Sequence, residues 1–358
     1  MYPFFRSLLF RLDPETAHAL TLRLIRLAGR LPPVRGVLRR IFTAPSPPVQ
    51  AFGLTFSNPI GLAAGYDKDG LGWRGLATLG FGHIEVGTVT PRPQEGNPKP
   101  RIFRLVEARA VINRMGFPGK GAEFVARQLP GGLYPPRPTG GLYPPRPPGL
   151  VLGVNIGKNK DTPLENAARD YLSLLQTFAP LADYLGVNVS SPNTEGLRRL
   201  QARDALQELL SALAVQRRLE VERLGRPVPL LVKLAPDLSD TELDDALEAI
   251  LSTGMDGAIA TNTTIGREGL NRSLCERSSS LSGEAGGLSG APLRSLSTEM
   301  VRKIAARTQG KLPVIGVGGV ASAQDVREKL EAGACLVQLY TGLIYEGPAL
   351  VKRILMEI

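Results

Sequence analysis

The sequence predicts an α/β fold, a closed (β/α)8 barrel of the TIM type with an amphipathic helical extension at its amino terminus. Short apolar runs alternate with helical stretches over about 300 residues, which is the length such a barrel needs. Polar residues follow nearly every run, as they do where a barrel collects its functional groups. We therefore divide the chain into an extension, 1–42, and a barrel domain, 50–358, joined by a Pro- and Ser-rich linker.

The extension is interpreted as two short amphipathic helices. The second is expected to begin with Asp13 as N-cap, Pro14 at the first helical position and Glu15 in the first turn. Its apolar stripe consists of Leu20, Leu24, Ile25, Leu27 and Leu31, and its basic side of Arg23, Arg26 and Arg30. This pattern is typical of a helix at a lipid surface, and an ordinary helix packed on its own domain would show it too.

Eight apolar or β-branched runs are predicted as buried parallel strands. They are 60–63, 83–86, 151–155, 184–189, 230–234, 257–261, 314–317 and 336–339. An open doubly wound sheet is the main alternative, but such a sheet uses mainly one switch point for its ligands. Here polar or glycine residues follow all the runs, which favours the barrel: Lys68, Thr88, Asn155, Asn188, Lys233, Asn262, Gly319 and Thr341.

One segment is a tandem duplication. Residues 131–138 read GGLYPPRP, and residues 140–147 repeat them letter for letter. Such a Pro-rich unit is extended rather than helical, and either a tolerated loop expansion or a ligand for an aromatic-lined recognition domain would have this composition. Because the segment precedes the run at 151–155, we expect it at the amino-terminal face of the barrel, opposite the functional groups.

The net charge of +10 suits a partner with negative charge, such as nucleic acid, acidic lipid or an anionic substrate. Charge alone does not choose among these, but eight arginines lie within 1–42 against two acidic residues. The chain has two cysteines and two histidines without paired spacing, so we expect neither a disulfide framework nor a metal site. A membrane-spanning run and a secretory cleavage site are also not expected.

Glycine-rich turns at the last two strands predict a phosphate site. Residues 316–319 read GVGG at the end of the seventh run, and 340–342 read YTG at the end of the eighth. Barrels characteristically hold phosphate on backbone N–H groups at these two places. Gly290, in the sequence GGLSG, is expected to contribute to the same site.

Lys233 lies inside an otherwise apolar run, where an unpaired cation is costly. It is expected to point into the site and meet an anion, although an ion pair with Asp237 is the structural alternative. A flavin would account for it, since a cation near the pyrimidine end of the ring stabilises the reduced anion. Lys68 is a second candidate for such a role.

Side-chain amides predict a ring-shaped substrate whose edge alternates N–H and C=O groups. The amides at or near strand ends are Asn113, Asn155, Asn188, Asn193 and Asn262. Ser191 has neither His18 nor His83 near it in sequence, which argues against a hydrolytic triad. As a general base it would have to pass its proton onward, and Thr194 is the expected partner.

Six motifs closely resemble those of the quinone-dependent (class 2) dihydroorotate dehydrogenases. They are AAGYDKDG (63–70), EVGTVTP (85–91), NRMGF (113–117), NIGKNK (155–160), NVSSPNT (188–194) and ATNTT (260–264). The resemblance covers essentially the whole chain, including His18, and only the duplicated segment departs from it. Serine at position 191 matches class 2, because the class 1 relatives resemble this pattern but have cysteine there.

The resemblance implies a barrel that binds FMN and oxidises (S)-dihydroorotate to orotate in de novo pyrimidine (UMP) biosynthesis, with a membrane quinone as final electron acceptor. Ser191 would remove a proton from C5 of the substrate while flavin accepts hydride from C6. Substrate would be held by Lys68, Asn113, Arg114, Met115, Gly116, Phe117, Asn188, Asn193, Asn262 and Thr263. FMN would be held by Ala64, Lys68, Thr88, Asn155, Asn188, Lys233, Thr261, Gly290, Gly319, Tyr340 and Thr341.

The quinone site implied by the resemblance is formed by His18, Arg104 and Tyr340, with residues 1–42 as its entrance and as the contact with the membrane surface. The protein would then be a monomer bound peripherally to the cytoplasmic side of the inner membrane, with no nucleic-acid partner. Two alternatives are an RNA-modifying flavin barrel of the dihydrouridine-synthase type, which would carry a cysteine acid, and a catalytically silent phosphate-binding barrel.

Overall fold

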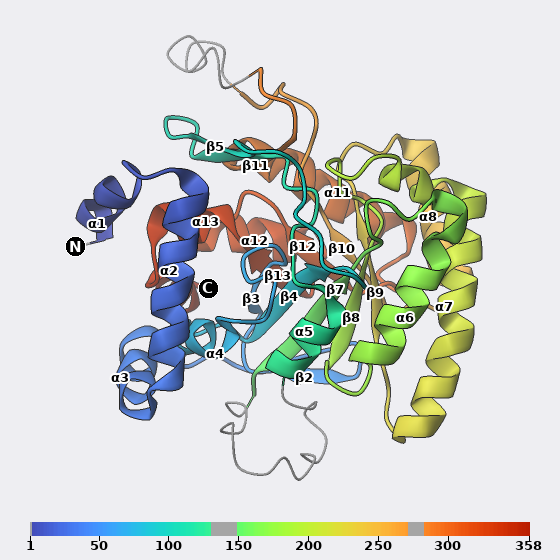
Figure 1. Ribbon diagram of the computed structural model, residues 1–358, viewed down its shortest axis with the longest axis horizontal. Coiled ribbons are helices and arrows are strands. Elements are labelled where there is room, and N and C mark those ends of the chain that lie inside the picture. The colour runs from blue at the N-terminus through green and yellow to red at the C-terminus, as the bar shows by residue number, and fades with distance from the viewer. Residues whose placement is uncertain (1, 130–148, 271–282) are drawn as a thin grey trace.

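Eight parallel strands close into a barrel, which confirms the fold predicted from the sequence (Figure 1). The computed structural model describes residues 2–129, 149–270 and 283–358. The barrel strands are β3 (Ile60–Leu62), β4 (His83–Val89), β7 (Val151–Ile156), β8 (Tyr184–Asn188), β9 (Leu230–Leu234), β10 (Gly257–Ala260), β12 (Val314–Val317) and β13 (Leu336–Leu339). Each pairs with the next in chain order, and β13 closes onto β3 through the pair Val337 and Ile60.

Helices surround the barrel, so that both faces of every strand are covered (Figure 1). They are α4 (Trp73–Leu76), α5 (Gly121–Gln128), α6 (Ala167–Phe178), α7 (Arg203–Leu224), α8 (Asp240–Ser252), α11 (Arg294–Arg307), α12 (Ala323–Glu331), α13 (Thr341–Glu346) and α14 (Leu350–Glu357). Short 3-10 helices are η1 (Ala77–Leu79), η2 (Leu164–Asn166), η3 (Leu197–Gln201) and η5 (Ala291–Leu293). The duplicated segment, 131–147, lies outside the described residues.

Two glycines allow large rings inside the barrel. A Cβ atom added to Gly61 would lie 2.0 Å from the ring of His83, and one added to Gly153 would lie 2.2 Å from the ring of Tyr184. Both rings are fully buried. The interior is therefore filled by side chains from alternate strands, as expected of a packed barrel core.

Two small antiparallel sheets, which the sequence pattern did not predict, flank the barrel. The hairpin of β1 (Val49–Ala51) and β2 (Leu54–Phe56) packs Phe56 against the first residues of the barrel strands. The second sheet consists of β5 (Ile102–Leu105), β6 (Ala110–Asn113) and β11 (Gly287–Gly290), in the order β11-β6-β5. It brings the end of β6, with Asn113, beside the segments that follow the barrel strands.

The extension contains three helices, not the two predicted: α1 (Tyr2–Leu9), α2 (Pro14–Arg30) and α3 (Pro32–Phe42). Asp13 caps α2 as predicted, because its Oδ1 accepts from the N–H groups of Glu15 and Thr16, both at 3.0 Å. The additional helix begins at Pro32, where proline is tolerated because the first N–H groups of a helix have no internal partner.

Helix α2 lies directly against the barrel domain. A Cβ atom on Gly29 would be 2.5 Å from the backbone nitrogen of Gly75 in α4, and one on Gly75 would be 2.0 Å from the carbonyl oxygen of Ile25. This contact turns the other face of α2 outward, where Leu24 and Leu27 are more than half exposed. None of the helices in the described ranges is long and apolar enough to cross a membrane.

Candidate active site

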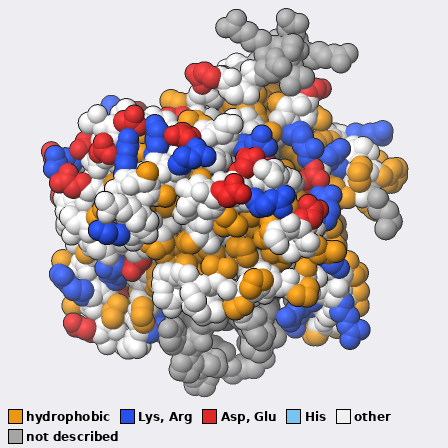
Figure 2. Space-filling model, turned by 180° about the vertical axis from the view of Figure 1, so that it is seen from behind, with side chains coloured by type: hydrophobic (Ala, Val, Ile, Leu, Met, Phe, Trp, Pro, Cys, Tyr) orange, Lys and Arg blue, Asp and Glu red, His pale blue; other side chains and the backbone are white. Residues whose placement is uncertain are grey.

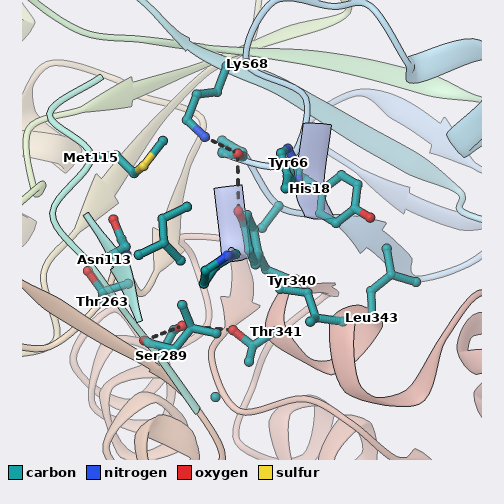
Figure 3. A pocket seen from close by; sticks show the side chains of 18 of the residues that line it. His18, Tyr66, Lys68, Asn113, Met115, Thr263, Ser289, Tyr340, Thr341 and Leu343 are labelled. Carbon is teal, nitrogen blue, oxygen red and sulfur yellow. Dashed lines mark hydrogen bonds between the residues drawn. The ribbon is translucent and has the colours of Figure 1, made fainter. Parts of the chain in front are cut away.

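One cavity of about 600 Å³ lies between the carboxyl ends of the barrel strands, helix α2 and the sheet of β5, β6 and β11 (Figure 3). We call it the central cavity. Its lining includes most of the residues proposed from the sequence: Ala64, Lys68, Thr88, Asn113, Met115, Gly116, Phe117, Asn188, Ser191, Asn193, Lys233, Thr261, Asn262, Thr263, Gly290, Gly319, Tyr340 and Thr341. His18 and Arg104, proposed for the quinone site, line it too.

Two of the proposed residues do not line the cavity. Asn155 lies behind its wall, where its side-chain oxygen accepts hydrogen bonds from Thr88 and, at 3.0 Å, from Asn188. Arg114 points away, because its guanidinium pairs with Glu284 and lies 4.7 Å from the centre of the Phe103 ring. Asn155 can therefore orient the side chains of Thr88 and Asn188. The Arg114 side chain holds the loop of 113–117 in place and does not reach the cavity.

Amide side chains form two hydrogen-bonded groups at the polar side of the cavity. Asn193 Nδ2 donates to Asn113 Oδ1 at 3.1 Å, and Asn262 Nδ2 donates to Ser190 Oγ at 3.0 Å and to Asn188 Oδ1 at 3.3 Å. Because the amides hold each other, their remaining donors and acceptors face the cavity in fixed directions. Such a surface suits a small ring with alternating donors and acceptors.

Ser191 lies just beyond β8 and is 5% exposed. Its Oγ accepts a 3.3 Å hydrogen bond from the backbone N–H of Asn193. The nearby Thr194 hydroxyl is buried without a hydrogen-bonding partner among the described residues. His83 is sealed inside the barrel and His18 lies in α2, so neither forms a hydrogen bond with Ser191 in the part of the chain that is described.

Lys233 brings a buried cation to the cavity, next to Asn188 on the neighbouring strand. It is 5% exposed, and burial lowers the pKa of its ammonium while the charge of Glu85 raises it. The alternative of an ion pair with Asp237 is wrong, because Asp237 pairs with Arg198 at 2.8 Å. In the described residues Lys233 has neither a salt bridge nor a hydrogen bond through its ammonium, which suits an anionic ligand in the cavity.

Glu85 is a buried carboxylate that the sequence pattern did not single out. It accepts from Asn155 Nδ2 at 2.8 Å, from the Tyr184 hydroxyl at 3.0 Å and from Gln338 Nε2 at 2.9 Å. Three donors from three other barrel strands stabilise a charge that burial would otherwise make costly. This polar layer forms the floor beneath Lys233 and Asn188.

Glycines shape the end of the cavity next to β12 and β13. Gly290, Gly318 and Gly319 have φ angles of 95°, 127° and 74°, which disfavour other residues. A Cβ atom on Gly319 would also lie 2.4 Å from that of Arg294. Ser289 and Thr341 join hydroxyls across the same end at 2.8 Å (Figure 3). Backbone without side chains and paired hydroxyls form a concave surface of the kind that holds phosphate.

Aromatic rings form the side of the cavity that faces the extension (Figure 3). The ring of Tyr66 lies between His18, at 5.0 Å, and Tyr340, at 5.6 Å, in edge-to-face contacts. Burial, helped by the charge of Lys68, lowers the pKa of His18 to about 4, so this imidazole is neutral at pH 7. Tyr66 was not predicted as a site residue, although the motif 63–70 contains it.

Arg104 connects the extension to the barrel domain. Its guanidinium donates to the carbonyl oxygens of Leu9, at 3.2 Å, and Leu12, and lies 4.6 Å from the centre of the Phe10 ring. Phe10, Leu9 and Tyr2 line the cavity as well, and no sequence motif had indicated them. Arg104 thus fixes the turn between α1 and α2 while it borders the cavity.

The fold and the site define a (β/α)8-barrel protein whose cavity is lined by a buried lysine, a glycine-rich end and a set of amide side chains. Relatives named as dehydrogenases identify its class as oxidoreductase. The chain belongs to the dihydroorotate dehydrogenase family, in its quinone-dependent class, since the family model for dihydroorotate dehydrogenase matches residues 48–358 and relatives with that quinone-dependent name match nearly end to end.

Two relatives illustrate the match, and both are called dihydroorotate dehydrogenase (quinone). The protein from Azotobacter vinelandii is 50% identical over 99% of this chain and 95% of its own length. The one from Anaeromyxobacter is also 50% identical, over 99% of this chain and 91% of its own length. Family membership removes the RNA-modifying barrel and the silent phosphate-binding barrel as alternatives.

Solved structures with this fold include the DHODH of Eimeria tenella. Its complex with ferulenol gives a TM-score of 0.82 at 39% identity, covering 96% of this chain and 90% of the other. Its ligand-free form gives 0.81 at 40% identity, covering 96% and 94%. The coverage includes the barrel and most of the rest of the chain.

Proposed function

We propose that the protein oxidises (S)-dihydroorotate to orotate with FMN as hydride acceptor and a membrane quinone as final electron acceptor, in de novo pyrimidine (UMP) biosynthesis. The observation that carries this proposal is the central cavity, which has an amide-lined polar side, a glycine-lined end and an aromatic side formed with the extension. Relatives at 50% identity are named for the same quinone-dependent reaction.

The donor set fits FMN. Gly290, Gly319 and Thr341 suit its phosphate, and the Lys233 ammonium, without a salt bridge among the described residues, suits the anionic edge of its ring. Ala64, Lys68, Thr88, Asn155, Asn188, Thr261 and Tyr340 complete the proposed FMN site, with Asn155 acting from behind Thr88 and Asn188. When bound, FMN accepts a hydride from the substrate and passes electrons to quinone.

The amide side chains hold the substrate ring in this proposal. Asn113, Asn188, Asn193 and Asn262 offer it donors and acceptors, and Lys68 suits its carboxylate. The remaining substrate residues that line the cavity are Met115, Gly116, Phe117 and Thr263. Arg114, which the resemblance also assigns to the substrate site, would act by holding the loop of 113–117 through its pair with Glu284. Ser191 removes the proton from C5 as general base and passes it on through Thr194, whose buried hydroxyl has no hydrogen-bonding partner among the described residues and is free for this role.

Quinone enters from the aromatic side, past His18, Arg104 and Tyr340. We propose that residues 1–42 form a quinone and membrane domain attached to the catalytic barrel of 50–358. Exposed apolar side chains of all three helices, among them Phe4, Leu24 and Val37, would enter the lipid interface, with the arginines at the headgroups. Figure 2 shows hydrophobic and basic side chains close together along the edge that these helices form. The protein would act as a monomer, peripherally, on the cytoplasmic side of the inner membrane.

An anaerobic two-step experiment tests the proposal. Purified protein should be yellow, dihydroorotate should bleach its flavin absorption within one turnover, and added quinone should restore the colour. A colourless protein that takes up no FMN would show that the cofactor assignment is wrong. Bleaching by dihydroorotate without recovery on quinone addition would refute the assignment of the electron acceptor alone.

A further inference from the structure

An ion pair lies behind the segment that carries Ser191. Arg198, in η3, and Asp237, just after β9, are joined at 2.8 Å between Nη1 and Oδ2. Their side chains are only 23% and 19% exposed, yet neither residue lines the central cavity. The proposed function gives this pair no role.

The other guanidinium nitrogens of Arg198 bind two backbone carbonyls. Nε donates to Ser190 O at 3.1 Å, and Nη2 donates to Thr263 O at 3.0 Å. The carbonyl of Ser190 belongs to the peptide unit that joins Ser190 to Ser191. One guanidinium therefore ties the segment of Ser191 to the segment after β10 that carries Asn262 and Thr263.

Asp237, which follows β9, binds two further residues of the segment after β10. Its Oδ1 accepts from the Thr264 hydroxyl, and its Oδ2 accepts from the backbone N–H of Ile265 at 3.2 Å. The ion pair thus joins the segments that follow β8, β9 and β10. Because Nε, Nη1 and Nη2 each serve a different partner, a lysine would keep the charge without reproducing the three-way contact.

An exposed ion pair elsewhere in this protein differs from the pair of Arg198 and Asp237. Arg203 and Glu248 are joined at 2.9 Å, but their side chains are 57% and 60% exposed, and such pairs contribute little. Arg198 and Asp237 are shielded, and their remaining polar atoms bind the backbone of Ser190, Thr263 and Ile265 and the Thr264 hydroxyl. Hydrogen bonds to charged groups in such a setting fix geometry more strongly.

We propose that Arg198 is a positioning residue for the proton-transfer step: it holds the peptide before Ser191 against the Thr263 carbonyl, and Asp237 orients its guanidinium. This inference rests on Ser191 being the base, as proposed above. A base must lie within hydrogen-bonding reach of the proton that it removes, and a displacement of about 1 Å can cost about 100-fold in rate.

The test is the limiting rate of flavin reduction by dihydroorotate in anaerobic single turnovers. R198Q should lower this rate by about 10- to 100-fold, while the half-saturating substrate concentration changes less than about threefold. R198K should be nearly as slow as R198Q. The matched control R203Q, which breaks the exposed pair, should stay within about twofold of the wild type.

A double-mutant cycle tests whether Arg198 acts through Ser191. The variant carrying both S191A and R198Q should be no slower than S191A alone, because the position of the base is irrelevant once the base is gone. If the double variant were slower than S191A by the full factor that R198Q alone causes, the two residues would act independently and the proposal would be overturned. A rate within about twofold of the wild type in R198Q or R198K would also overturn it. A wild-type rate in S191A would instead refute the base assignment of the proposed function.

Retained FMN and an unchanged melting temperature show that a variant is folded. If R198Q does not fold, D237N tests the same inference, because it removes the charge that orients Arg198 without removing the carbonyl contacts. D237N should slow flavin reduction by about three- to tenfold, the size of one weakened charge-assisted contact. An unaltered rate in D237N would overturn the proposal.

Discussion

Lys233 shows, at the scale of single residues, how the barrel presents a charge to a ligand. Its strand neighbours Val232 and Leu234 are fully buried in the core, while its own ammonium reaches the central cavity. Glu85 lies below it and is already occupied by three donors, from Asn155, Tyr184 and Gln338. The charge of Lys233 is thus left for an occupant of the cavity.

We expect K233M to weaken FMN binding. Methionine keeps most of the apolar volume but removes the cation, and the loss of one buried charge contact of about 1.4 kcal/mol corresponds to about tenfold in affinity. Fluorescence titration of the flavin-free protein measures this constant. K311M, at an exposed lysine, is the control and should bind FMN as the wild type does. Equal affinity in K233M would mean that the lysine does not contact the cofactor.

The sequence predicted Lys233 but not Glu85, and the reason is physical. A charged residue stands out when its strand is otherwise aliphatic, as in LLVKL. Glu85 lies in HIEVGTV, where polar and small residues are mixed and every residue is buried, so no periodicity distinguishes the inward side. Its donors come from strands far away along the chain, which only the closed barrel brings together.

The flanking sheet of β5, β6 and β11 was not predicted from the sequence. Strand β6 has four residues, and it pairs with β11, whose residues lie about 175 positions later. By contrast, the barrel strands and the start of α2 carry local signals in their apolar runs and in the Asp13 cap. Helix α3 was missed because the apolar and basic pattern continues across Leu31, so nothing except the two prolines marks a new helix.

The outward face of helix α2 is predicted to bind the membrane surface. We expect L24Q/L27Q to weaken binding to lipid vesicles by about 30-fold, since two half-exposed leucines inserted at the interface contribute about 2 kcal/mol in total. Cosedimentation with vesicles measures this loss, and reduction of a water-soluble quinone should be unchanged.

A matched control is available on α7. Val215 and Leu219 are 52% and 54% exposed, close to the 58% and 56% of Leu24 and Leu27. V215Q/L219Q should therefore bind vesicles like the wild type. If both double variants lose binding equally, the extension is not the specific membrane contact.

The stability of the whole molecule depends on a barrel interior that excludes water. The buried His83 makes this stability depend on pH. Burial lowers the pKa of His83 to about 3, and neither ring nitrogen has a hydrogen-bonding partner among the described residues. An unfolded histidine has a pKa of about 6.5. Between these two values the unfolded chain binds a proton that the folded chain does not bind. The free energy of unfolding therefore falls as the pH falls below about 6.5.

We expect H83F to reduce this loss of stability in acid. The His83 ring lies edge-to-face with the Phe56 ring, with 5.3 Å between the ring centres. Phenylalanine keeps an aromatic ring at this position and removes the titrating group. Denaturant unfolding of the FMN-saturated protein at pH 7 and pH 5 gives the comparison: the difference between the two free energies should shrink by about 1 to 2 kcal/mol in H83F. An identical difference in both proteins would show that His83 is accessible to protons in the folded state.

The most direct test of the central claim separates the two half-reactions in the S191A variant. Its flavin should be reduced by dihydroorotate about 10²- to 10⁴-fold more slowly than in the wild type, the usual loss when a general base is removed. Once reduced chemically, the same flavin should be reoxidised by quinone at the wild-type rate, because the proposed quinone path runs along the aromatic side formed by His18, Tyr66 and Tyr340 and does not use the Ser191 hydroxyl. Near-normal reduction by dihydroorotate would contradict the account.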